Sequence, residues 1–403
     1  MLNLPFGLNK SSDPFKFLTI DISADSAKCL AFYNENGVNK IIGVGKQAME
    51  QNAIRSGSIV EYDQVEQAVE DAVMQATEDL EERSHQTIIG VSGDMCLGHM
   101  TTARVVRGTG APVTQKELAE LSKKIIDSSF AEANNKIAQI TGNSDIELEL
   151  ITSTPVYTKL DEKLTNQAVG VSAETVELAI YAAFSPTYHV RNLQRLSKKL
   201  GLNLIAIGSE MYALISVLKK VKTKHLDCII MDIGSDTTDI GIVFGGGIVS
   251  TRTLSIGGKH FTEMVSQKMG ITYKEADNVK KSYALGKLTK SESLIVQSSL
   301  QDVLDIWLDG IELTFGEFTG VKTFSPNIYL VGGSSQLPDI MELVSKEPWT
   351  HSIPFKNPPE FYKIGLDELT SITDATGRAA TPDFVLPASL SGIYDELRGG
   401  QNG

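Results

Sequence analysis

The sequence has little cysteine and no long apolar run, and each absence excludes a class of protein. Cys29, Cys96 and Cys228 stand far apart in a chain of 403 residues, so there is no disulfide framework or zinc-binding spacing, and a reducing cytoplasm is favoured. The most apolar segments, residues 179–184 and 228–231, are far shorter than the roughly 20 residues of a membrane-spanning helix. We therefore expect neither a disulfide-rich secreted protein nor a membrane-spanning one.

Positive charge is also scarce. The chain has 50 acidic and 37 basic residues and a net charge of −13, which disfavours binding to nucleic-acid phosphates or to anionic lipid. No nucleic-acid partner is expected. Near the N-terminus, Pro5 and Gly7 interrupt the apolar residues and no small-residue cleavage site follows, so we expect a tail at residues 1–14 and not a signal peptide.

The composition is that of a globular protein with more than one domain. Hydrophobic residues make up 41% of the chain and charged residues 22%, so there is enough apolar surface to form a core. A chain of 403 residues is too long for one ordinary core, because single domains cluster near ~100 to 200 residues. Several domains are therefore expected.

One pattern occurs twice. A strand, a polar turn and a second strand are predicted at residues 15–32, and the same order returns at residues 228–244. In each copy an aspartate, Asp21 or Asp232, ends the first strand just before a turn rich in small and hydroxyl residues. The chain therefore contains a divergent duplication, which predicts two domains that face each other across a cleft.

Both turns suit a phosphate chain. Small residues leave backbone N–H groups free to point at phosphate oxygens, and a preceding aspartate can hold a hydrated Mg²⁺. Either aspartate alone could simply cap its own turn, but the pair favours convergence of Asp21 and Asp232 on one metal ion. A third signal is the strand at residues 327–331, which leads into Gly332 and Gly333, where the backbone can approach a flat ring closely.

Between the two copies of the strand-turn-strand pattern, further helical and strand patterns predict an inserted module. Thr114 and Glu117 form a capping box at the start of a predicted helix. The predicted elements are helices at residues 114–131, 186–200 and 210–222 and strands at residues 147–157 and 175–184. An earlier helix has an apolar face at three-to-four spacing, formed by Val65, Ala68, Val69, Ala72, Val73 and Ala76.

The order of the three turns resembles the phosphate-1, phosphate-2 and adenosine motifs of the actin, Hsp70 and sugar-kinase superfamily. These motifs are the Asp21 turn, residues 232–239 and residues 331–334. The resemblance implies an α/β fold of duplicated actin-like (ribonuclease H-like) domains that binds ATP with Mg²⁺.

Within that superfamily the sequence is most similar to FtsA, and next to PilM-type pilus proteins, over about residues 15–390. The similarity to FtsA lies in residues 56–60, 255–262 and 276–280. FtsA and PilM carry an inserted α+β subdomain called 1C (SHS2-like), and residues 100–186 stand at the corresponding place. The implied organisation is a tail at residues 1–14, a first domain at residues 15–99 and 187–225, the 1C subdomain at residues 100–186, a second domain at residues 226–375 and a closing segment at residues 376–403.

The resemblance also implies the roles of individual residues. Asp21 and Asp232 would position Mg²⁺ and take part in catalysis. Asp277 and Lys280 would meet the ribose, although a solvated helix face is an alternative for this pair. The other residues implied to bind the cofactor are Ser23, Ser26, Lys28, Gly234, Ser235, Asp236, Thr237, Thr238, Gly257, Gly258, Gly332, Gly333 and Ser334.

Hydrolysis is expected to be slow at most. Ser23 stands where the superfamily usually has a glycine in the first turn. Ser235 and Asp236 stand where it usually has two glycines in the second turn. The carboxylate of Asp236 adds negative charge where phosphates would lie. Glu210 stands where the superfamily often has a glutamate near the attacking water, and the alternative is a surface helix-cap residue.

The resemblances leave two functions open. The resemblance to FtsA implies an ATP-binding, protofilament-forming scaffold of bacterial cell division, which links a tubulin-like division-ring protein to the membrane machinery. The resemblance to PilM implies a cytoplasmic scaffold of type IV pilus assembly, which binds a pilus inner-membrane protein. A small-molecule kinase is the least favoured function, because the sequence shows no candidate general base beside a substrate pocket. No basic amphipathic helix like the family's membrane anchor follows Pro387, so we expect a cytoplasmic protein recruited to the inner face of the cell membrane through a partner.

Overall fold

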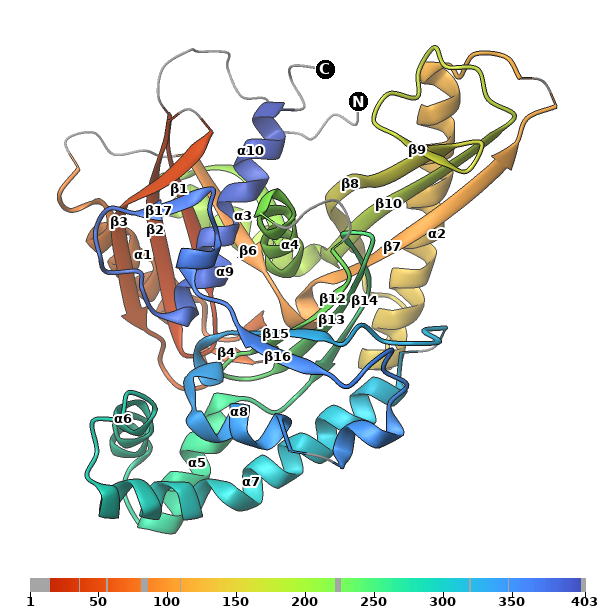
Figure 1. Ribbon diagram of the computed structural model, residues 1–403. Coiled ribbons are helices and arrows are strands. Elements are labelled where there is room, and N and C mark those ends of the chain that lie inside the picture. The colour runs from red at the N-terminus through yellow and green to blue at the C-terminus, as the bar shows by residue number, and fades with distance from the viewer. Residues whose placement is uncertain are drawn as a thin grey trace.

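The computed structural model of the protein describes residues 15–399 except 36, 56, 81–85, 109, 222–225, 319 and 347. Two large β-sheets, each covered by helices, form the body, and a smaller sheet with one long helix projects from it (Figure 1). The expected tail at residues 1–14 and the chain end at residues 400–403 lie outside the described residues.

The first large sheet has six strands. They are β1 (Phe15–Ile22), β2 (Ser26–Glu35), β3 (Val38–Ala48), β6 (Gln86–Val91), β11 (Asn203–Ser209) and β17 (Ile372–Asp374). β1, β2 and β3 form an antiparallel meander, and β6 and β11 follow in parallel on the other side of β1. The order is therefore β11-β6-β1-β2-β3-β17.

The second large sheet repeats this plan. Its strands are β12 (Cys228–Ile233), β13 (Thr238–Phe244), β14 (Gly247–Leu254), β15 (Asn327–Val331) and β16 (Glu360–Lys363). β12, β13 and β14 again form an antiparallel meander, and β15 and β16 again run parallel beside the first strand. The order β16-β15-β12-β13-β14 matches β11-β6-β1-β2-β3, so the duplication predicted from the sequence is present in the topology.

Helices pack on both sheets. Those of the first unit are α1 (Tyr62–Thr77), α3 (Thr187–Lys199), α4 (Glu210–Val221), α9 (Val385–Ser389) and α10 (Ser391–Gly399), and those of the second are α5 (Gly258–Met269), α6 (Tyr273–Ala284), α7 (Lys290–Gly316) and α8 (Pro338–Val344). The apolar face predicted for α1 is the one that packs against the sheet. Gly43 and Gly45 on β3 allow this close packing, because a Cβ at either position would overlap a backbone carbonyl of α1.

The inserted module interrupts the first unit between β6 and α3. It consists of β7 (Leu97–Val106), β8 (Leu148–Leu160), β9 (Lys163–Thr165), β10 (Thr175–Pro186) and α2 (Gln115–Thr141), with the sheet order β7-β10-β8-β9. Thr114 and Glu117 cap α2 as predicted. The helix ends at Thr141 and not at residue 131, because Ala133 and Ile137 continue its buried face up to the left-handed cap at Gly142.

The module also contacts the second unit. On α2, the Lys136 ammonium donates a hydrogen bond to the carbonyl of Thr251 on β14, at 3.0 Å. A Cβ at Gly247, where β14 begins, would press against Val156 and Met100 of the module. The module is therefore packed against both large units.

The remaining elements are short. They are the hairpin β4 (Ile54–Arg55) and β5 (Ser58–Ile59) and the 3-10 helices η1 (Gly93–Met95), η2 (Gly333–Gln336), η3 (Trp349–Ser352), η4 (Leu366–Glu368) and η5 (Pro382–Phe384). Within the described ranges, no helix combines the length and the apolar character needed to cross a membrane.

Candidate nucleotide-binding site

The first predicted turn contains a buried ion pair. Asp21 on β1 and Lys28 on β2 are cross-strand partners, and Lys28 Nζ lies 2.7 Å from Asp21 Oδ2. Lys28 also donates a hydrogen bond to Ser23 Oγ, at 3.1 Å. Because an opposite charge and a hydroxyl surround the ammonium, the cost of burying both charges is offset.

Asp25, which the sequence interpretation did not single out, is the centre of the same turn. The hydroxyls of Ser23 and Ser26 donate hydrogen bonds to its two carboxylate oxygens, at 3.2 and 3.1 Å. Burial works against the ionisation of Asp25, but nearby ammonium groups outweigh it and lower its pKa to about 2. These groups are Lys28, Lys46 and Lys281, so lysines from both halves of the chain surround this turn.

Three buried carboxyl groups converge from three elements. Asp21 lies on β1, Asp232 on β12 and Glu210 at the first position of α4. Burial, Asp239 and Asp21 raise the pKa of Asp232 to about 8, against the opposing effect of Lys28. Burial together with Asp21 and Asp232 raises the pKa of Glu210 well above its ordinary value.

Glu210 is therefore not a surface helix-cap residue, and that alternative is wrong. The residue is 3% exposed, and its side chain lies against Gly90 on β6, where a Cβ would overlap Glu210 Oε1. No sequence pattern had singled out Gly90. Its role depends on β6 and α4 meeting in space, 120 positions apart in the chain.

The second turn is fastened to the start of α5 and to the third turn. The carbonyl of Gly234 accepts hydrogen bonds from the N–H of Gly258, at 2.9 Å, and from Ser334 Oγ, at 3.0 Å. Gly257 has no room for a side chain, since a Cβ would lie 2.7 Å from the carbonyl oxygen of Ser235. The structure thus brings three predicted motifs together in one cluster.

The side chains of two residues of the second turn, Asp236 and Thr238, pair or form hydrogen bonds with other parts of the protein. Asp236 is buried and forms an ion pair with Lys259 on α5. Thr238 is fully buried; its hydroxyl donates to the carbonyl of Ile256, at 2.8 Å, and accepts from Trp307 Nε1, at 2.9 Å. The Thr238 side chain therefore supports the turn from the core, whereas Thr237 ends the turn through its carbonyl, which accepts from the N–H of Gly234 at 3.0 Å.

The two residues implied to meet a ribose lie beside this cluster. Lys280 donates hydrogen bonds to the carbonyl of Gly258, at 2.8 Å, and to Thr262 Oγ1, at 2.5 Å. Asp277 Oδ1 lies 3.3 Å from Lys280 Nζ. Because the Lys280 side chain is only 12% exposed, the pair is not part of a fully solvated helix face.

Gly332 packs the third turn directly against Asp232. Its backbone angles, φ 85° and ψ 158°, belong to a region that essentially only glycine occupies. A Cβ here would overlap Asp232 Oδ1 and lie 2.6 Å from the carbonyl oxygen of Ile233. The neighbouring Gly333 is less constrained, since a Cβ there would meet only Asp383, at 3.5 Å.

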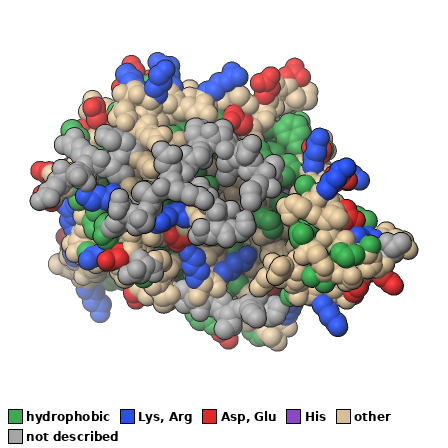
Figure 2. All heavy atoms as spheres, turned by 90° about the horizontal axis from the view of Figure 1, so that it is seen from above, with side chains coloured by type: hydrophobic (Ala, Val, Ile, Leu, Met, Phe, Trp, Pro, Cys, Tyr) green, Lys and Arg blue, Asp and Glu red, His purple; other side chains and the backbone are tan. Residues whose placement is uncertain are grey.

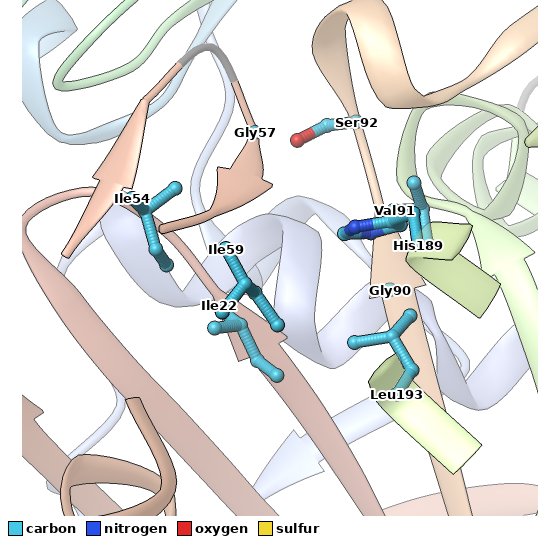
Figure 3. Close-up of a pocket in the computed structure, with 9 residues that line it drawn as sticks. All are labelled: Ile22, Ile54, Gly57, Ile59, Gly90, Val91, Ser92, His189 and Leu193. Carbon is cyan, nitrogen blue, oxygen red and sulfur yellow. The ribbon is translucent and has the colours of Figure 1, made fainter. Parts of the chain in front are cut away.

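A small cavity elsewhere in the first unit is not this site. Figure 3 shows the His189 ring and the Ser92 hydroxyl facing Ile22 and Ile59 across it. Its volume of about 20 Å³ has room for roughly one water molecule. Burial lowers the pKa of His189 to about 4, so the ring is neutral, and none of the three converging carboxyl groups lines the cavity.

Comparison with known proteins supports the same architecture. The family described as cell division protein FtsA matches residues 229–384. The FtsA of Bacillus subtilis (strain 168) is 22% identical over 354 residues, which are 81% of this chain and 75% of that protein. The solved PilM-PilN type IV pilus biogenesis complex has a chain that aligns with a TM-score of 0.65 and 16% identity, over 94% of this chain and 99% of that one.

The protein has the actin-like fold and resembles FtsA. A further structure, the ethanolamine utilization protein EutJ from Carboxydothermus hydrogenoformans, aligns with a TM-score of 0.50 and 14% identity, over 95% of this chain and 92% of that one. In this actin-like chain the FtsA match covers β12 to η5, which includes the second and third turns.

Proposed function

We propose that this protein is an ATP-binding, FtsA-like scaffold of bacterial cell division, which polymerises and links a division-ring protein to the membrane machinery. The observation that carries the nucleotide part is the convergence of Asp21, Asp232 and Glu210, which come from both duplicated halves. The FtsA match at residues 229–384 supports the cell-division part. The proposed location is cytoplasmic, at the inner face of the cell membrane through a partner.

The donor set fits Mg²⁺ bound together with a nucleotide. Asp21 and Asp232 supply the oxygen ligands that Mg²⁺ prefers. Burial and then the neighbouring carboxyl groups of Asp239 and Asp21 raise the pKa of Asp232, and a bound cation would offset both effects. Among the described residues no group of three or more acidic, histidine or cysteine side chains forms a metal cage. The ion would therefore keep water and phosphate ligands, as Mg²⁺ commonly does, and would neutralise phosphate charge.

Hydrolysis in this proposal is slow at most. A general base must be ionised to accept a proton from water, and burial together with Asp21 and Asp232 raises the pKa of Glu210, which disfavours its ionised form. Glu210 is therefore poorly suited to act as a general base toward the attacking water. For the other residues at the three turns, we propose the cofactor-binding roles that the resemblance implies.

Nucleotide binding predicts a gain in stability. Mg-ATP at about 100 times its dissociation constant should raise the free energy of unfolding by about 2.7 kcal/mol, because it binds only the folded state. We expect Asp232→Asn to remove most of this gain without destabilising the free protein, since burial and the neighbouring carboxyl groups raise the pKa of Asp232 to about 8 and so favour its neutral form. Thermal melting with and without Mg-ATP measures both effects.

The matched control is Asp302→Asn, which alters an exposed carboxylate on α7. It should melt and respond to Mg-ATP like the unaltered protein. Absence of any shift in the unaltered protein at millimolar Mg-ATP would reject the nucleotide proposal. An undiminished shift in Asp232→Asn would reject the role of Asp232.

We further propose that the inserted module is a 1C (SHS2-like) subdomain and a contact surface between protomers. Hydrophobic side chains are visible on its projecting lobe in Figure 2. At the end of the module where β10 begins, five apolar residues are 40% exposed or more: Val105, Val106, Leu164, Val169 and Val171. Clustered exposed apolar residues mark interaction surfaces in soluble proteins.

A charge placed on this surface should abolish assembly and spare the nucleotide site. We expect Val106→Glu with Leu164→Glu to stop Mg-ATP-dependent pelleting and filament formation, as judged by electron microscopy, while the Mg-ATP melting shift persists. Met74→Glu on α1, also exposed, is the control and should still assemble. Filaments that survive the double substitution would show that the contact lies elsewhere.

The second candidate is a PilM-like scaffold of type IV pilus assembly. It is favoured by the alignment with the PilM-PilN complex over 94% of this chain. Purified protein decides between the two: co-sedimentation with a tubulin-like division protein supports the first function. Binding to the cytoplasmic segment of a pilus inner-membrane protein supports the second.

A further inference from the structure

The Asp236–Lys259 pair explains how an acidic residue can stand in a phosphate-binding turn. Asp236 occupies a position of the second turn where the resemblance leads one to expect glycine, and its carboxylate is buried. Unpaired, it would repel phosphate groups at short range. Lys259 supplies the opposite charge as its ion-pair partner.

Lys259 is held in place by the turn it neutralises. Its backbone N–H donates a hydrogen bond to the carbonyl of Ser235, at 2.8 Å, and the preceding N–H, that of Gly258, donates to Gly234. These two hydrogen bonds fasten the backbone at the start of α5 to the turn. The Lys259 side chain is 33% exposed, compared with 10% for Asp236, so part of its surface lies open to solvent beside the turn.

The charges around Lys259 come from both halves of the chain. Burial lowers its pKa; among neighbouring charges Glu263 raises the pKa and Arg55 lowers it, while the contact with Asp236 favours the ammonium form. Arg55 lies on β4 of the first unit, so two cations from opposite halves repel each other here. An anion bound between the halves would relieve this repulsion.

An ammonium group has three N–H donors, which can serve two acceptors at the same time. We propose that Lys259 selects a nucleoside triphosphate over a diphosphate by bridging the Asp236 carboxylate and the terminal phosphate. This inference rests on the proposed nucleotide-binding function. In this arrangement Asp236 orients the ammonium and Lys259 shields the phosphate from Asp236, so Lys259 compensates for the carboxylate that stands where the resemblance leads one to expect glycine.

The test compares the affinities for Mg-ATP and Mg-ADP by calorimetry. Lys259→Met removes one charged hydrogen bond to the terminal phosphate together with the ammonium that pairs with Asp236, so we expect the affinity for ATP to fall about tenfold to 100-fold. The affinity for ADP should change much less, and Lys259→Arg should keep most of the preference for ATP. Binding of ADP also reports that each variant is folded.

Two further variants sharpen the result. Lys268→Met removes an exposed ammonium at the other end of α5, where it pairs with Asp302, and should leave both affinities unchanged. Asp236→Gly combined with Lys259→Met removes the repulsion together with its shield and should recover part of the lost ATP affinity.

The outcomes separate this inference from the function on which it rests. If the unaltered protein binds neither nucleotide, the proposed function fails. If it binds both and Lys259→Met keeps the same ratio of affinities, the nucleotide site stands and the bridging role of Lys259 is overturned.

Discussion

Replacing Lys28 with Met is expected to lower the free energy of unfolding by about 3–5 kcal/mol, the usual cost of removing one partner from a buried ion pair. Lys28 Nζ lies 2.7 Å from Asp21 Oδ2, and both side chains are less than a tenth exposed. Burial lowers the pKa of Lys28, but Asp21 and Asp25 outweigh it and raise the pKa far above the ordinary value. Without the ammonium, Asp21 loses its ion-pair partner and still lies near the carboxyl groups of Glu210 and Asp232.

Urea denaturation measures this loss, and a double-substitution cycle assigns its cause. Adding Asp21→Asn to Lys28→Met removes both charges and should recover much of the lost stability, because the uncompensated carboxylate is then gone. Lys346→Met is the surface control: its ion pair with Glu342 is more than half exposed and should be worth less than about 1 kcal/mol. Equal losses in Lys28→Met and Lys346→Met would contradict a buried structural pair.

Replacing Gly332 with Ala is expected to destabilise the protein and to abolish nucleotide binding. The backbone at Gly332, φ 85° and ψ 158°, should cost another residue about 1–3 kcal/mol. The added Cβ would also displace Asp232, which the proposed site needs in place. Thermal melting should therefore show a lower midpoint and no stabilisation by Mg-ATP.

Gly333→Ala is the matched control one residue further along. Gly333 begins η2, and a Cβ there would make an ordinary contact at 3.5 Å. We expect nearly unchanged stability and a full Mg-ATP shift. If Gly332→Ala behaves like Gly333→Ala, the packing of the third turn against Asp232 is not required for the site.

The fold was largely predictable because its signals are local. The strand–turn–strand pattern at β1–β2 and again at β12–β13 depends on neighbouring residues, and so does the capping box that begins α2. The sheet orders that match between the two units could only be inferred from this duplication. The end of α2 was missed, because the helix continues along a face buried by the module's own sheet.

The candidate site was predictable only in part. Strand-end aspartates and glycine-rich turns carry a recognisable sequence pattern, and the structure places the three turns in one cluster. Asp25, Gly90 and Lys259 were not singled out, since each owes its place to a contact with another element. The GGKH segment at residues 257–260 did contain Lys259, but nothing in the sequence indicated its partner.

The sequence by itself determined the duplicated α/β plan, the inserted module and the strand ends that carry Asp21 and Asp232. These follow from hydrophobic periodicity and turn chemistry, which act over a few residues. Only the tertiary structure decided which charges meet: Glu210 is buried beside both aspartates, and Lys259 neutralises Asp236. The reason is that the pKa and the pairing of a charged group depend on burial and on neighbours within a few ångströms, and folding draws these neighbours from distant parts of the chain.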